Sequence, residues 1–250
     1  MGPVLRIGQT QLDAPALLEK LTQYQMIPQL AQRLIIETAI APVECDPEQV
    51  YRSFCQNHQL LTEADQQEWL QQQQLTLDQL LDQLVYEERL SHFKEENWGS
   101  QLESYFLQRK ASLDRVLYSL IRTQDASLAQ ELYFRISDDG DSFAELARQY
   151  AEGQEAQTGG LIGPVELSVP HPVLAQMLSV SQPGQLWAPT PIGEWLVIAR
   201  LEKFVPAQMD EATRQRLLDE LFQEWLRQQL QETPMEVMTS TPDPSPMPVT

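Results

Sequence analysis

The first 110 residues carry apolar side chains at spacings of three and four, the period of amphipathic helices. Asp13 and Asp46 each precede such a segment, where a side-chain oxygen can accept a hydrogen bond from the first helical turn. Thr62 and Thr76 each have an acidic or amide side chain three residues later, which is the spacing of a capping box. The pattern therefore predicts helices only over residues 12–110.

The pattern changes after residue 112 to short apolar segments separated by turn residues. RVLYSLIRT and PIGEWLVIARLEK are typical of strands, whereas SFAELARQY and HPVLAQMLSV are typical of short helices. TGGLIGPV contains Gly159, Gly160 and Gly163, which allow backbone conformations that other residues rarely adopt, and Pro183 with Gly184 is typical of a turn. These segments predict a small α/β domain over residues 113–205.

One more helix is predicted after this domain, over Met209–Glu232. It has a long apolar stripe without glycine or proline, made of Leu217, Leu218, Leu221, Phe222, Trp225, Leu226 and Leu230. Such a stripe must be covered, either by the N-terminal helices or by a partner protein, and we expect the former. Residues 233–250 are rich in proline, serine and threonine and lack periodicity, so they are predicted to be a disordered tail.

The predicted fold class is therefore α+β. A helical domain (1–112) precedes the α/β domain (113–205), and a long helix (206–232) packs back on the helical part before the tail (233–250).

The order of motifs from Phe143 onward resembles the C-terminal two-thirds of a parvulin-type peptidyl-prolyl isomerase domain. The family pattern is roughly F-x-x-L-A, G-G-x-L-G, a helix, P-G-x and a closing strand that begins G-x-H. The flanking helices are similar in character to those of the periplasmic chaperone family that assists outer-membrane proteins. The resemblance implies a mostly antiparallel sheet and the handling of unfolded or nascent, proline-containing polypeptide.

Most of the family's polar site residues are replaced in this chain. By the resemblance, the two histidines fall on Ser119 (or Leu120) and on Trp195, and the cysteine or aspartate falls near Gly153. Further replacements are Leu161 for an aspartate, Leu174 for a phenylalanine and Pro170 for a methionine; the threonine is matched by Thr190. We therefore assign no catalytic residue and expect weak or absent isomerase activity.

The remaining side chains could still form an apolar pocket for proline. The predicted substrate-binding residues are Ser119, Leu161, Leu174, Met177, Leu178, Thr190 and Trp195. Trp195 could instead fill the core, as large aromatic residues on strands usually do, and His171 could be a solvated turn residue. A pocket that binds the ground state and the transition state equally is a receptor and not a catalyst.

The net charge and the cysteine content limit the classes of partner and cofactor that the protein is expected to bind. The formal charge of −19 disfavours nucleic acid and anionic membranes. Cys45 and Cys55 have no clustered ligands, so two reduced cysteines are expected, with no metal and no cofactor. No secretory signal or membrane-spanning segment stands out, so we expect a cytoplasmic protein unless an export signal has been removed.

Three functions stay open on the sequence. The first is a divergent parvulin-like isomerase and foldase with weak or lost catalysis. The second is a non-catalytic chaperone or assembly adaptor with the same fold. The third is a subunit of a larger complex that docks through the C-terminal stripe. All three predict polypeptide partners.

Overall fold

The computed structural model describes residues 2–236, which divide into two compact units. The helical unit contains the chain up to Ser100 and again from Arg216, and the sheet unit is the continuous segment Gln101–Gln215. Helices and antiparallel sheets confirm the predicted α+β class. The domain bounds expected from the sequence at 112/113 and 205/206 stay a prediction, and most of the predicted tail lies outside the described residues.

The helical unit begins with a short hairpin that the sequence did not predict. Its strands β1 and β2 have only three residues each and are almost fully exposed, and Gly8 between them has φ +59°. The elements are β1 Leu5–Ile7, β2 Thr10–Leu12, α1 Ala14–Gln23, α2 Ile27–Ile40, α3 Pro47–Asn57, α4 Glu63–Gln73 and α5 Leu77–Trp98, followed by a 3-10 turn at Gly99–Gln101.

The predicted caps form at the starts of these helices. Asp46 accepts hydrogen bonds from two amides of α3, and Thr62 and Thr76 complete capping boxes with Asp65 and Gln79. Each box satisfies two amides that a helix end otherwise leaves free. Local sequence therefore determines where α3, α4 and α5 begin.

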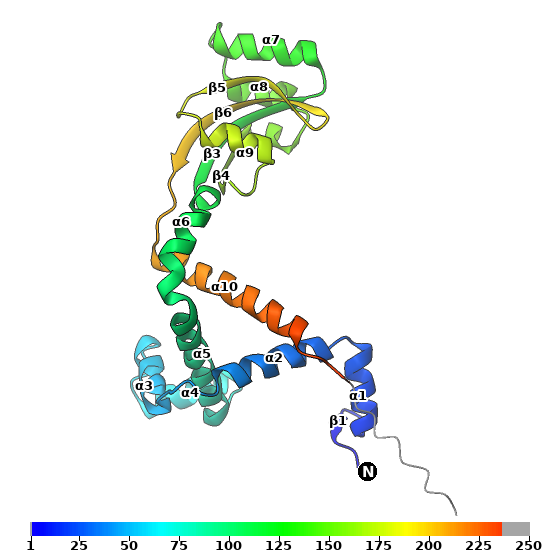
Figure 1. The fold of residues 1–250 in the computed structure, drawn as a ribbon, viewed down its shortest axis with the longest axis vertical. Helices are drawn as coiled ribbons and strands as arrows, with labels where there is room; N and C mark the ends of the chain where they lie inside the picture. The colour runs from blue at the N-terminus through cyan, green and yellow to red at the C-terminus, as the bar shows by residue number, and fades with distance from the viewer. Residues whose placement is uncertain (1, 237–250) are drawn as a thin grey trace, which may run out of the picture. The chain divides into compact units, whose positions relative to one another are not determined.

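The last helix, α10 (Glu211–Glu232), packs against the N-terminal helices as predicted (Figure 1). Phe222 and Leu226 of α10 are buried with Ile36 and Ile40 of α2. An aromatic group from α5 and α10 surrounds them, made of Phe93, Trp98 and Trp225. At its margin Lys94 Nζ lies 2.6 Å from Asp219 Oδ1. Two segments far apart in the sequence thus share one core.

The sheet unit has four antiparallel strands in the order β4-β3-β6-β5. Its elements are α6 Leu102–Leu113, β3 Arg115–Thr123, α7 Ala126–Ser137, α8 Phe143–Tyr150, a 3-10 turn at Gln154–Thr158, β4 Leu161–Glu166, α9 Pro172–Ser179, β5 Leu186–Ile192 and β6 Trp195–Val205. Helix α7 was not predicted from the sequence, although Asp125 caps it by accepting hydrogen bonds from the amides of Ser127 and Leu128.

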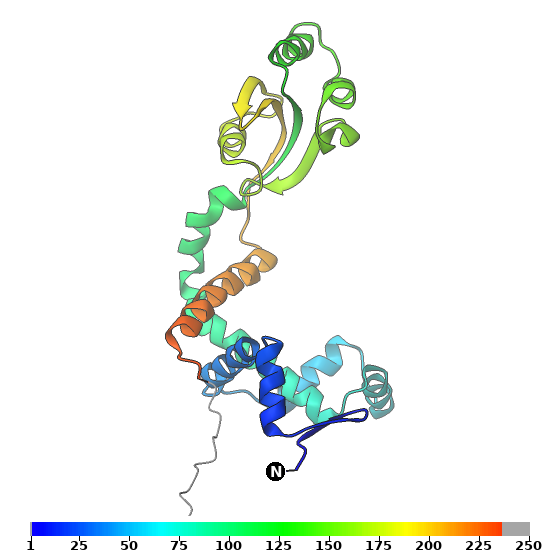
Figure 2. The ribbon, with the colours of Figure 1, turned by 90° about the vertical axis from the view of Figure 1, so that its right-hand side faces the viewer.

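The two faces of this sheet are covered by different helices (Figure 2). On one face Ile121 and Ile198 pack with Leu132 of α7 and Phe143 of α8. On the other face the side chains of β3 and β6 pack with α9; they include Tyr118, Leu120, Val197 and Ala199, together with Leu174 and Leu178. The alternation of a pleated strand sends successive residues of β3 to opposite faces.

Glycines just before β4 and within it allow this strand to approach β3 closely. Gly160 has φ +83°, and a Cβ there would lie 2.8 Å from the carbonyl oxygen of Leu120. At Gly163, with φ +108°, a Cβ would lie 2.5 Å from the carbonyl oxygen of Val116. The predicted structural role of these two glycines therefore has a steric cause. Gly159 also has a positive φ, +64°.

Within residues 2–236, none of the helices has both the length and the apolar character needed to cross a membrane.

Candidate functional site

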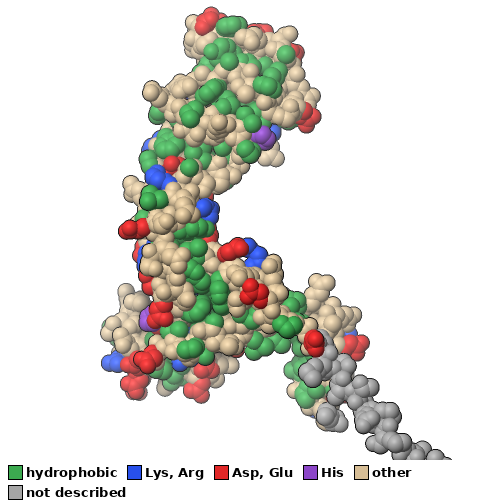
Figure 3. Space-filling view, viewed as in Figure 1, with side chains coloured by type: hydrophobic (Ala, Val, Ile, Leu, Met, Phe, Trp, Pro, Cys, Tyr) green, Lys and Arg blue, Asp and Glu red, His purple; other side chains and the backbone are tan. Residues whose placement is uncertain are grey.

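A groove lies on the α9 face of the sheet in the sheet unit. Its volume is about 430 Å³, which is within the usual range for ligand pockets. Its lining is mostly apolar and consists of Tyr118, Leu120, Arg122, Pro170, His171, Leu174, Ile192, Gly193, Glu194, Trp195 and Val197. Figure 3 shows green hydrophobic side chains exposed on the visible face of this unit, with acidic side chains toward its margin.

Strand alternation and one tight turn position the groove's side chains. Tyr118, Leu120 and Arg122 are alternate residues of β3, so all three face α9. Gly193, with φ +62°, lies in the turn between β5 and β6 and leads directly into Trp195. The paired strands therefore form the floor of the groove and their connecting turn forms one end.

The start of α9 forms another part of the rim. His171 caps this helix, because its Nδ1 accepts a hydrogen bond of 3.3 Å from the amide of Val173. The imidazole is exposed and lines the groove. His171 is thus both the turn residue that the sequence suggested and a lining residue.

Two of the predicted binding residues, Leu174 and Trp195, line this groove. Trp195 is half-buried and packs against the core of the α9 face. It is therefore in part a core residue and in part a groove residue, the two alternatives that the sequence left open.

The other five predicted binding residues do not line the groove. Met177 and Leu178 are buried on α9, and Leu161 on the edge strand β4 is 45% exposed. The Thr190 hydroxyl donates to the carbonyl oxygen of Ala188 at 2.9 Å. Ser119 is also outside the groove.

Ser119 points to the opposite face of the sheet from Tyr118 and Leu120. Its hydroxyl donates to Glu202 Oε1 at 2.5 Å, and Glu202 also pairs with Arg200, whose guanidinium lies over the ring of Phe143. Of the two residues that the resemblance aligned with the family's first histidine, only Leu120 reaches the groove. Because side chains alternate along a strand, a shift of one residue in the alignment moves the aligned side chain to the opposite face of the sheet.

Arg122 is the most distinctive polar group of the groove, and it was not among the binding residues predicted from the sequence. Its Nε lies 3.1 Å from Glu155 Oε1, and its guanidinium carbon lies 5.2 Å from the centre of the Trp195 ring. The Glu155 side chain is only 4% exposed, whereas that of Arg122 is 35% exposed. The alternation in RVLYSLIRT could have placed Arg122 on the same face of the strand as Leu120. Its ion-pair partner Glu155, however, is distant in the sequence.

Tyr118 adds a neutral polar group to the same floor. Burial raises the pKa of its phenol above the ordinary value, and the negative charge of Glu155 raises it further. The hydroxyl therefore keeps its proton at neutral pH. The groove thus combines apolar walls with one paired cation, Arg122.

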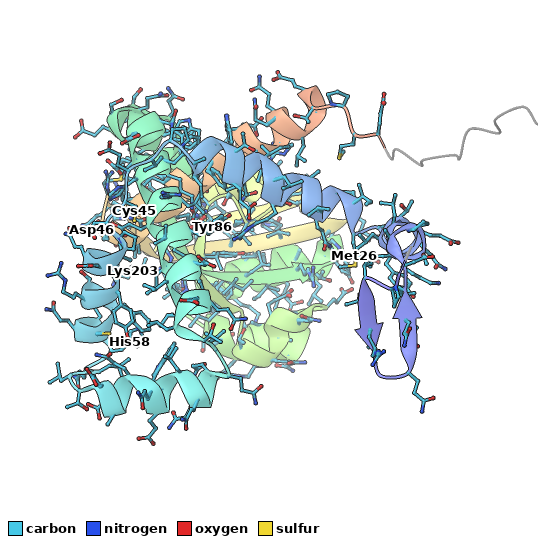
Figure 4. The ribbon with its side chains drawn as sticks, turned by 90° about the horizontal axis from the view of Figure 1, so that it is seen from below. Met26, Cys45, Asp46, His58, Tyr86 and Lys203 are labelled. Carbon is cyan, nitrogen blue, oxygen red and sulfur yellow. The ribbon has the colours of Figure 1, made fainter. Side chains whose placement is uncertain are left out.

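A larger cavity in the helical unit has a different character. It has a volume of about 750 Å³ and is bounded by α3, α5 and the loop before α3, with Glu44, Cys45, Asp46, Glu88, Arg89 and His92 among its lining. Burial raises the pKa of the Cys45 thiol, and the charge of Glu88 adds to this effect. Figure 4 shows Cys45 and Asp46 together near the start of α3 and His58 at its far end. Across residues 2–236, no three His, Cys, Asp or Glu side chains are grouped as metal ligands.

Comparison with known proteins finds a family match within the sheet unit. Residues 120–203 match the Rotamase family model, described as a PPIC-type PPIase domain. A protein named Chaperone SurA from Thiobacillus denitrificans is 33% identical over 100 residues, which cover 36% of this chain and 23% of that protein. Chaperone SurA from Pseudomonas fluorescens is 32% identical over 132 residues, covering 48% and 30%.

The chain thus spans less than a third of the length of these curated relatives. Among solved structures, the peptidylprolyl isomerase PrsA from Bacillus cereus aligns over 95% of this chain and 94% of its own, with 16% identity and a TM-score of 0.44.

Proposed function

Because residues 120–203 form a parvulin-type peptidyl-prolyl isomerase domain, we propose that its groove binds proline-containing segments of unfolded or nascent polypeptide. The supporting observation is the groove itself, an apolar cavity of about 430 Å³ that contains Leu174 and Trp195. A proline ring is apolar and lacks an N–H, so binding it does not require a polar partner for the ring.

The protein acts mainly as a binding protein in this proposal, with weak or lost isomerase activity. The rotation barrier of an amide, about 18–20 kcal/mol, arises from resonance, and an enzyme must favour the twisted state to lower it. At the aligned positions, Ser119 points away from the groove, Trp195 replaces the second histidine and Gly153 has no side chain.

A titration followed by NMR tests the binding site. A blocked Ala-Ala-Pro-Phe peptide is expected to shift the signals of Leu120, Gly193 and the Trp195 indole, and its alanine analogue without proline is expected to bind more weakly. Trp195→Ala should weaken binding of the proline peptide. Val180→Ala serves as the control, because Val180 is 69% exposed and outside the groove.

The alternative is a chaperone whose client binds the helical unit, with the sheet unit as a spacer. It is favoured by exposed apolar side chains on and beside α2, since Leu30 is 48%, Leu34 52% and Tyr24 62% exposed. Peptide-induced shifts confined to residues 12–100, with the groove signals unchanged, would support this alternative and refute the first proposal.

A further inference from the structure

The guanidinium of Arg122 occupies space that most residues at position 153 would fill. A Cβ on Gly153 would lie 2.2 Å from Arg122 Nε and 2.1 Å from Glu155 Oε2. Gly153 has an extended backbone, with φ −118°, so its conformation does not require glycine. The requirement is steric: the missing side chain leaves room for the ion pair of Arg122 and Glu155.

The Arg122 side chain lines the groove and is 35% exposed, although its Nε is buried 3.1 Å from Glu155 Oε1. The ion pair therefore leaves part of the guanidinium facing the groove. A guanidinium carries several N–H donors and no acceptor. Trp195 supports its face, which restricts the direction in which those donors point.

The charges around Arg122 favour a neutral acceptor over an anion. Glu155 already compensates the positive charge, and the carboxylate of Glu194 lies in the lining of the groove. An anionic ligand would meet a groove without excess positive charge. A peptide carbonyl oxygen accepts strong hydrogen bonds without adding charge.

We infer that Arg122 donates a hydrogen bond to the carbonyl oxygen of the residue that precedes proline in a bound peptide. The inference rests on the proposed function, because it assigns the polar contact of the same groove. Arg122 is then a binding residue that fixes the peptide, Glu155 and Trp195 fix Arg122, and Gly153 makes the arrangement possible.

This contact favours binding over catalysis. Amide resonance places negative charge on the carbonyl oxygen and is lost when the bond twists. A donor at that oxygen therefore stabilises the planar amide at least as well as the twisted one. Interactions that do not strengthen in the transition state increase affinity without increasing the rate.

A pair of matched peptides tests the contact on the unchanged protein. One is the blocked Ala-Ala-Pro-Phe peptide, and the other has sulfur in place of the carbonyl oxygen before proline, which is a weaker acceptor. We expect the Kd measured by NMR titration to be several-fold higher for the sulfur peptide. Equal Kd values for the two peptides would overturn the inference.

Variants then locate the donor. Arg122→Met should raise the Kd of the oxygen peptide about tenfold or more, since hydrogen bonds to charged groups are stronger than neutral ones. It should change the Kd of the sulfur peptide much less. Arg115→Met is the matched control, because Arg115 is an exposed residue at the start of the same strand and is outside the groove.

Two further variants separate folding from binding. Arg122→Met leaves Glu155 buried without a partner, so the double variant with Glu155→Gln removes that charge as well. Gly153→Ala keeps both charged groups but displaces them, and should also weaken binding of the oxygen peptide. If the variants fold and bind the oxygen peptide with unchanged affinity, the role of Arg122 is refuted but the proposed function is not. If the peptide does not shift the NMR signals of groove residues in the wild-type protein, the proposed function is refuted.

Discussion

Phe222 on α10 offers the sharpest test of how the helical unit is held together. Its side chain is buried at 3% exposure, the Trp225 ring stacks at 5.6 Å and the Trp98 ring lies 6.2 Å away. Lys94 Nζ lies 4.9 Å from the ring centre. Phe222→Ala should therefore remove contacts with α2 and α5 and with Trp225 of its own helix, and such substitutions cost about 3–5 kcal/mol.

This loss is a large fraction of the stability of a typical domain, about 5–15 kcal/mol. With a urea dependence of about 2 kcal/mol per molar, the unfolding midpoint of the helical unit should fall by about 1.5–2.5 M. The indole N–H signals report each unit separately. Trp98 and Trp225 report the helical unit, and Trp187, whose Nε1 donates to Ser181 Oγ at 2.7 Å, reports the sheet unit.

The control is Gln223→Ala, an exposed substitution on the same helix. If Phe222→Ala and Gln223→Ala had the same midpoint at Trp98 and Trp225, the core shared by α2, α5 and α10 would not exist in solution. The reasoning that the C-terminal helix completes the helical unit would then be refuted.

Three other predictions concern the turn before β4, catalysis and the start of α10. Gly160→Ala should lower the melting temperature of the sheet unit more than Gly184→Ala, because the φ values are similar (+83° and +87°) but only the Cβ at 160 meets the carbonyl of Leu120; equal losses would contradict the steric argument. A protease-free assay on an Xaa-Pro peptide should show isomerisation well below that of an ordinary parvulin, and turnover within about tenfold of one would contradict the account of the replaced residues. Hydrogen bonds from the amide of Thr213 and then from its side chain lower the pKa of Asp210 below the ordinary value of 3.8. The Asp210 carboxylate therefore stabilises the folded state above pH 3.8, and this stabilisation is lost as the pH falls through the lowered pKa. Asp210→Asn should therefore show a flatter dependence of melting temperature on pH in acid, and parallel curves for the two proteins would contradict it.

Elements with strong local signals could be predicted from the sequence. The capping boxes at Thr62 and Thr76 and the apolar alternation of β3 depend on residues a few positions apart, and the structure confirms them. The hairpin before α1 gave no such signal, because its strands have three residues each and are almost fully exposed. Asp125, which caps α7, is a local signal of the same kind in the sequence.

The candidate site was harder to predict because it depends on pairings between distant segments. The alignment with the family's motifs pointed to Leu174 and Trp195, which line the groove, but it left Ser119 and Leu120 as alternatives on opposite faces of the sheet. Arg122 and Glu155 are far apart in the sequence, and their pairing depends on the absence of a side chain at Gly153. The spacing of apolar and polar residues along the sequence does not predict a contact of this kind.

The helical unit is made of two stretches of chain with the whole sheet unit between them. During synthesis, α2 and α5 leave the ribosome long before α10, and at about 5–20 residues per second the delay is on the order of ten seconds. Throughout that interval the surfaces that will later cover Phe222 and Leu226 are exposed to water and to other nascent chains. The sheet unit, being continuous, can fold in the meantime. A protein proposed to bind unfolded polypeptide thus passes through a stage in which its own N-terminal half would need the same protection.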